Sequence, residues 1–216
     1  MPSTALQTAQ TNLQRVSDIL SFHTKEKNPG VGAPPPADAS LVLGATALTY
    51  AAWEAYVEDL AIEVVAFLSK TIPVSKVDDE VRTKIAENVP KWSLAGSGWR
   101  KVWRDQVYVF ARGTLGTKNF GMNTADAETV LKLFALVGVQ PFRDVRWKNA
   151  TTSQVKDRLQ SLVRDRGTVV HTAQLPTKYG LNNARRHREF VDRLLVKLDA
   201  TVEAQVTKIA GGKAPW

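Results

Sequence analysis

The residues with the clearest chemical potential lie in one short stretch, residues 163–172, which reads Val-Arg-Asp-Arg-Gly-Thr-Val-Val-His-Thr. It contains Arg164, Arg166 and His171. An imidazole can move protons near neutral pH, and a guanidinium is a permanent planar charge that suits phosphate oxygens. Together they provide the groups needed to cleave RNA by attack of its own 2′-hydroxyl on the adjacent phosphate. This chemistry needs no metal or other cofactor, and the sequence suggests no ligand set for a metal.

The two arginines differ in their geometry relative to His171. Arg164 lies seven positions before it, so on a regular helix the two share a face to within about 20°. Arg166 lies five positions before it, about 140° away around the helix. Gly167 is expected to interrupt the helix, and a looser helix there could turn Arg166 inward. The plain alternative is that His171 is a hydrogen-bonded residue at a helix end and that the arginines form a solvated basic edge.

Helical periodicity, broken by Pro and Gly, predicts the elements that position these residues. No paired alternation indicates a strand, so the predicted class is all-α, a single domain over residues 1–216. Asp38 or Ser40 is expected to cap the second helix and Thr124 the fifth. Residues 28–38 are expected to form a loop with four prolines and two glycines, and residues 211–216 a loose tail. The expected helices cover residues 4–27, 38–69, 78–88, 98–111, 124–137, 152 onward through the Arg/His stretch, and 182–209.

Composition limits the possible functions. The 216 residues are 44% hydrophobic and 23% charged, which predicts a buried core. A net charge of +8 favours an anionic partner such as nucleic acid. The absence of cysteine excludes disulfides, thiolate catalysis and cysteine-ligated metals. The most apolar region, residues 41–68, is interrupted by acidic side chains, so no membrane association is expected and a cytoplasmic location is predicted.

Three blocks of sequence, in their order and spacing, resemble the HEPN superfamily and in particular its RiboL-PSP-HEPN branch. The first reads Leu-Thr-Tyr-Ala-Ala-Trp-Glu-Ala-Tyr-Val-Glu-Asp-Leu, an acidic and aromatic helix. The second is an Asn-Phe-Gly turn followed by an apolar helix, and the third is the Arg/His stretch followed by the last helix. The blocks are residues 48–60, 119–121 with 130–138, and 159–171 with 190–199.

The resemblance implies a bundle of four or five helices that forms a homodimer, and a metal-independent endoribonuclease whose Arg/His motifs face each other across the dimer interface. His171 would be one functional residue. Arg166, with four intervening residues, is the better match for the other, and Arg164, with six, also fits. The family prefers a polar residue directly after the arginine; here Gly167 follows Arg166, and Asp165 follows Arg164. Relatives are often toxins or effectors of stress or phage defence, which would imply an antitoxin or a defence-system partner.

Other candidates lie outside the motif. Glu54 either orients the arginine or histidine or is a half-buried carboxylate bonded to a neighbour, whereas Glu58 and Asp59 are expected to face solvent. Arg185, Arg186 and Arg188 form the densest basic run, which either contacts RNA phosphates or is a polar helix face.

Two functions from different classes follow. The first is a homodimeric endoribonuclease that leaves a 2′,3′-cyclic phosphate and a 5′-hydroxyl. The second is a HEPN module that binds RNA or regulates a partner without cleavage, which Gly167 favours. A purely structural dimerisation domain is a third reading.

Overall fold

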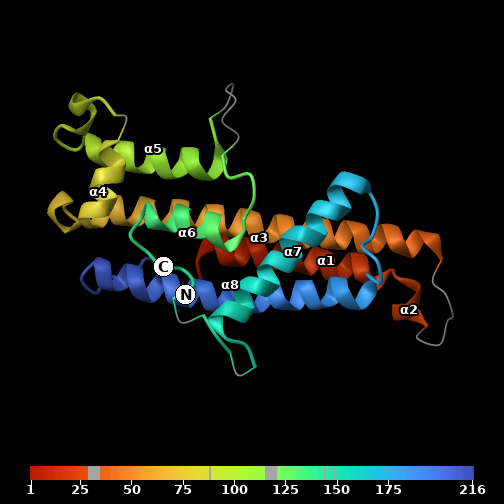
Figure 1. Cartoon of the computed structure of the whole chain (residues 1–216). Helices are drawn as coiled ribbons and strands as arrows, with labels where there is room; N and C mark the ends of the chain where they lie inside the picture. Colours follow the sequence, from red (N-terminus) through yellow and green to blue (C-terminus); the bar gives the residue numbers. More distant parts are fainter. Residues whose placement is uncertain (29–34, 88, 115–120, 144, 148) are drawn as a thin grey trace.

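Three long helices form the body of the molecule: α1 (Thr4–Ser21), α3 (Pro36–Thr71) and α8 (Leu181–Ile209). They lie side by side along the long axis, and α7 (Thr152–Thr172) crosses them obliquely (Figure 1). The computed structural model describes residues 1–28, 35–87, 89–114, 121–143, 145–147 and 149–216. Within these residues there are no strands, and the only β-type pairing is an isolated bridge between Trp147 and Ala150. The predicted all-α class is therefore confirmed.

The remaining helices cover one end and one side of this body. The helices α4 (Asp79–Ala86) and α5 (Gly98–Arg112) lie at one end, and α6 (Ala127–Ala135) packs between α3 and α7 (Figure 1). Two short 3-10 turns, Val74–Lys76 and Lys91–Leu94, connect α3, α4 and α5. The described helices include no segment that could cross a bilayer.

The first predicted helix is in fact two, because the chain breaks at His23, whose Nδ1 accepts the backbone N–H of Lys25 at 3.2 Å and so caps a second helix. Beyond α1 the chain turns at His23 and forms the single turn α2 (Thr24–Lys27). Asp38 is 4% exposed; one of its carboxylate oxygens lies 3.3 Å from Nδ1 of His23 and accepts the backbone N–H of Thr24 at 3.1 Å. Asp38 therefore lies inside α3, which begins after Pro35, and does not cap it. Residues 29–34 of the expected Pro/Gly loop lie outside the described residues.

The cap of α6 also differs from the prediction. Asp126 accepts the backbone N–H of Thr129 at 2.8 Å and is the N-cap residue. The hydroxyl of Thr124 instead lies 3.3 Å from that of Tyr50 on α3. Thr124 thus belongs to the packing of α6 against α3.

Helix α7 continues through Gly167, so the predicted interruption was wrong. Thr151 and Gln154 form a capping box at its start, and it ends at Ala173, which has φ 52°. Leu162 and Val169, seven positions apart, are both buried and hold α7 to the core on either side of the glycine. A glycine inside a helix costs only about 1 kcal/mol relative to alanine, which this burial outweighs.

The two ends of the chain are tied to the core. The backbone N–H and hydroxyl of Ser3 both donate to the carboxylate of Asp199 on α8. The expected loose tail is not loose at its end, because the half-buried side chain of Trp216 packs against the main core. The termini consequently lie close together on one side of α8 (Figure 1).

Candidate active site on helix α7

The outer face of α7 presents His171 and Arg164. Both side chains are exposed, and because the helix is continuous they share one face to within about 20°. Val155, Leu159 and Leu162 are buried on the opposite side. Within the described residues His171 has no hydrogen-bond or ion-pair partner, so its ring is open to solvent or to a second molecule.

The charge of Arg164 is only weakly compensated. Its Nη2 donates to Oγ of Ser161 at 3.3 Å, and its Nε lies 3.9 Å from a carboxylate oxygen of Asp165. That carboxylate is engaged elsewhere, because its other oxygen lies 2.9 Å from Nε2 of His187 on α8. An exposed guanidinium with such a distant counter-ion remains available to a phosphate.

Arg166 points to a different neighbour. Its guanidinium lies over the ring of Tyr50 on α3, 4.8 Å from the ring centroid. The hydroxyl of Tyr50 accepts the backbone N–H of Ala125 at 2.7 Å and donates to Oε1 of Glu54 at 3.0 Å. Arg166, Tyr50 and Glu54 therefore form one cluster between α7 and α3.

The electrostatics of Glu54 agree with this placement. Burial raises the pKa of this half-buried carboxyl, while the hydrogen bond from Tyr50 and the positive charges of Arg166 and Arg112 hold the rise back. Of the predicted site residues, the structure brings Glu54 and Arg166 together. It places Arg164 and His171 on a separate, outer face of α7.

The expectation that Glu58 faces solvent was wrong. Glu58 is 8% exposed, and its carboxylate lies 2.9 Å from Nη1 of Arg112, whose Nη2 donates to Asp59 at 2.5 Å. Burial raises the pKa of Glu58 to about 7 although Arg112 opposes the shift, and the charges of Glu54 and Asp59 add to it. The sequence did contain a signal for this burial: Glu58 lies four residues after Glu54, and residues four apart share a helix face.

The basic run of α8 separates into different environments. Arg185 is paired with Glu26, and Arg188 lies 3.4 Å from Asp192. Only Arg186 is exposed, and it lines a groove between α7 and α8. His187 is stacked on Tyr179 with ring centroids 5.9 Å apart.

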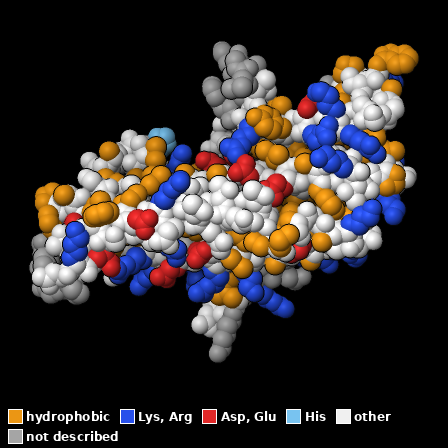
Figure 2. Space-filling view, turned by 180° about the vertical axis from the view of Figure 1, so that it is seen from behind, with side chains coloured by type: hydrophobic (Ala, Val, Ile, Leu, Met, Phe, Trp, Pro, Cys, Tyr) orange, Lys and Arg blue, Asp and Glu red, His pale blue; other side chains and the backbone are white. Residues whose placement is uncertain are grey.

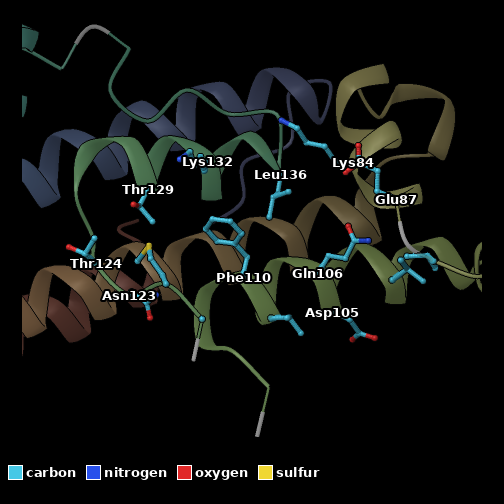
Figure 3. A pocket seen from close by; sticks show the side chains of 15 residues that line it. Lys84, Glu87, Asp105, Gln106, Phe110, Asn123, Thr124, Thr129, Lys132 and Leu136 are labelled. Atoms are coloured by element: carbon cyan, nitrogen blue, oxygen red, sulfur yellow. The ribbon is translucent and has the colours of Figure 1, made fainter. Parts of the chain in front are cut away.

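A larger cavity of about 940 Å³ lies between α4, α5 and α6 and contains none of the predicted site residues. Phe110 and Leu136 line its apolar part, and Lys84 and Glu87 lie at one end (Figure 3). Thr124 lines the far end, where its hydroxyl contacts Tyr50. The cavity thus approaches the Arg166 cluster only through Tyr50.

The sequence was compared with models of known protein families. The sequence model of the RiboL-PSP-HEPN family matches residues 11–204. The chain belongs to the RiboL-PSP-HEPN family. The match includes all of α3 and α7 and confirms the resemblance expected from the sequence, and membership indicates a ribonuclease or RNA-binding function. Neither the curated proteins nor the solved structures contain a match to this chain.

Proposed function

We propose that this RiboL-PSP-HEPN protein is a metal-independent endoribonuclease that acts as a homodimer. The observation that carries the proposal is that His171 and Arg164 lie on the same exposed outer face of a continuous α7. An unpartnered imidazole and a weakly compensated guanidinium on one face are the two groups that cleavage by the 2′-hydroxyl requires.

The proposed reaction needs two imidazoles. His171 of one copy accepts the proton of the 2′-hydroxyl as O2′ attacks the phosphorus atom. The bond from phosphorus to O5′ breaks, and His171 of the second copy donates a proton to the departing 5′-oxygen. Arg164 stabilises the negative charge that builds up on the non-bridging oxygens. The products are a 2′,3′-cyclic phosphate and a 5′-hydroxyl.

The position of Gly167 supports an antiparallel pairing of two α7 helices. Arg164 and His171 are about 10.5 Å apart along one helix axis, and Gly167 lies near the midpoint between them. A two-fold axis at that point would place His171 of one copy opposite Arg164 of the other. A Cβ added at Gly167 would meet nothing within 4 Å, so this face is open, and glycine permits close approach of a second backbone.

Exposed apolar side chains on α7 and α3 also favour a second copy. Val170 on α7 is 51% exposed and Leu48 on α3 is 44% exposed. Figure 2 shows hydrophobic side chains on the half of the molecule that holds the α2 end and also at the opposite end. Covering apolar surface of this kind is the usual driving force for association.

Arg166 is the better match to the family spacing, but its environment suggests a positioning role. The inward turn that would bring Arg166 toward His171 required a looser helix at Gly167, and α7 is regular there. We therefore propose that Arg164 is the catalytic cation. Arg166, held by Tyr50 and Glu54, fixes α7 against α3.

The deciding experiment is incubation of the purified full chain with RNA in EDTA. We expect cleavage that continues in the chelator, leaves DNA intact and falls at least about 100-fold in His171→Ala. The matched control is Thr172→Ala, the exposed neighbour at the same helix end, which should retain activity. Cleavage that EDTA abolishes, or that His171→Ala retains in full, would contradict the proposal.

A second candidate is an RNA-binding or regulatory module without cleavage. Gly167 favours it, because the polar residue expected after Arg166 is missing. In that case wild-type protein would bind RNA without cutting it, and His171→Ala would bind equally well.

The biological role we propose is that of a cytoplasmic toxin or effector in stress or phage defence, controlled by a partner protein. Induced expression of wild-type protein should then arrest growth with loss of cellular RNA. Expression of His171→Ala at the same level should not.

A further inference from the structure

A basic groove between α7 and α8 lies beside the proposed active site. It has a volume of about 460 Å³, within the range of small-ligand sites. The residues that carry the argument are Trp147, Arg158, Ser161, Arg186, Phe190 and Arg193, and together they are called the arginine–tryptophan groove.

The charge of this groove is strongly positive. Arg158 and Arg186 are exposed, and neither has an ion-pair partner among the described residues. Among the residues that the structure describes, Glu189 is the one acidic residue in the lining, and the lining residue His187 is already engaged by Asp165. Two uncompensated guanidinium groups on facing walls suit a phosphate.

The groove also contains an aromatic surface. The half-buried ring of Trp147 packs against Phe190, with centroids 6.1 Å apart and planes tilted by 56°. The guanidinium of Arg193 lies 5.6 Å from the Trp147 ring centroid. A base can stack on a tryptophan face or a guanidinium plane, and proteins that bind single-stranded nucleic acid commonly pair such surfaces with a basic groove.

The groove is joined to the outer face of α7. Ser161, which lines the groove, accepts the hydrogen bond from Arg164 at 3.3 Å. Arg158 precedes Arg164 by six residues, about 9 Å along the helix axis. A strand bound at Arg164 could therefore continue directly into the groove.

We propose that the arginine–tryptophan groove binds a nucleotide of single-stranded RNA next to the scissile phosphate. Arg158 and Arg186 contact its phosphate, and its base stacks on Trp147. This assignment rests on the proposed function in one respect, namely that the same strand reaches His171 and Arg164.

The test measures binding apart from cleavage. Full-length protein carrying His171→Ala is titrated with a 2′-O-methyl oligonucleotide, which has no free 2′-hydroxyl, over a range of salt concentrations. Adding Arg158→Gln with Arg186→Gln should weaken binding about tenfold or more. It should also reduce the slope of log K against log salt by about 0.7, since the two arginines neutralise one phosphate and each neutralised phosphate on a single strand contributes about 0.7.

The matched control removes two arginines from the same helix that already have acidic partners. Arg185→Gln with Arg188→Gln makes the same change in net charge, and binding should stay within about twofold. Trp147→Ala should weaken binding about tenfold, whereas Trp147→Phe should restore most of the affinity. Thermal unfolding of each variant establishes that it is folded at the binding temperature.

Equal affinity in the groove and control variants would overturn the proposal. So would a loss of affinity for polyglutamate as large as that for RNA, with no effect of Trp147→Ala, because the groove would then be a surface for acidic peptides. The proposed nuclease activity fails by a different result, the absence of cleavage in wild-type protein. Loss of oligonucleotide binding in the groove variants would support the groove even then.

Discussion

The guanidinium of Arg166 lies 4.8 Å from the centroid of the Tyr50 ring, on the opposite side of α7 from the solvent. Arg164, two residues earlier on the same helix, is exposed. Two arginines that fit the same sequence motif therefore have different environments, and their substitutions should have different consequences.

Substituting each arginine by alanine should separate catalysis from positioning. Arg164→Ala should lower kcat about 100-fold or more with little change in unfolding, because a single donor to a developing oxyanion contributes at that level. Arg166→Ala should lower the free energy of unfolding by about 1 kcal/mol, through loss of the contact with Tyr50 and of the positive charge near Glu54. Steady-state cleavage and urea unfolding provide the two measurements. A 100-fold loss of kcat in Arg166→Ala with unchanged stability would reverse the assignment.

If two α7 helices pack at Gly167, a larger side chain at this position should disrupt the dimer. Gly167→Leu should shift the protein toward monomer in analytical ultracentrifugation and lower cleavage in parallel, because the added side chain would separate the two backbones. Gly44→Leu is the control, since Gly44 is also a helix glycine with no atom within 4 Å of an added Cβ. A Gly167→Leu protein that remains dimeric and active would exclude the antiparallel crossing at this position.

Glu58 should make the protein less stable as pH rises. Its pKa is about 7 in the folded state, mainly through burial, and about 4.3 in an unfolded chain. Between those values the folded protein holds more protons than the unfolded chain, so this residue lowers the free energy of unfolding as pH increases from about 4.5 through 7.

The measurement is urea unfolding of wild type and Glu58→Gln from pH 5 to 8. The neutral amide should remove part of the decline, so the variant gains stability relative to wild type as pH rises. Glu80→Gln, an exposed change of the same charge, should leave the slope unchanged. Parallel curves for wild type and Glu58→Gln would contradict the assignment.

The sequence could predict most helices because their apolar spacing is regular. The apolar spacing of α7 also indicates that Arg166 faces the interior of the fold. The buried residues Val155, Leu159, Leu162 and Val169 follow helical spacing, and Arg166 occupies the position between the last two. An arginine within a buried stripe is expected to meet a partner inside the fold, here Tyr50.

Other features depended on contacts between distant segments. Asp38, from the start of α3, accepts the backbone N–H of Thr24 at the turn between α1 and α2, and Glu58 on α3 is paired with Arg112 from α5. Local spacing cannot reveal either partner, because each pair joins two separate helical segments. The arginine–tryptophan groove was missed for the same reason: Trp147, Arg158 and Arg186 come from three segments.

His187 is near the motif but should be structural, which a double-mutant cycle can establish. Its Nε2 lies 2.9 Å from Asp165, and its ring stacks on Tyr179, so it links α7 to α8. His187→Ala and Asp165→Ala should each lower the free energy of unfolding by about 1–2 kcal/mol. The double variant should lose less than the sum of the two. If His187 instead acted on RNA, His187→Ala would lower kcat as strongly as His171→Ala at a temperature where the variant is fully folded.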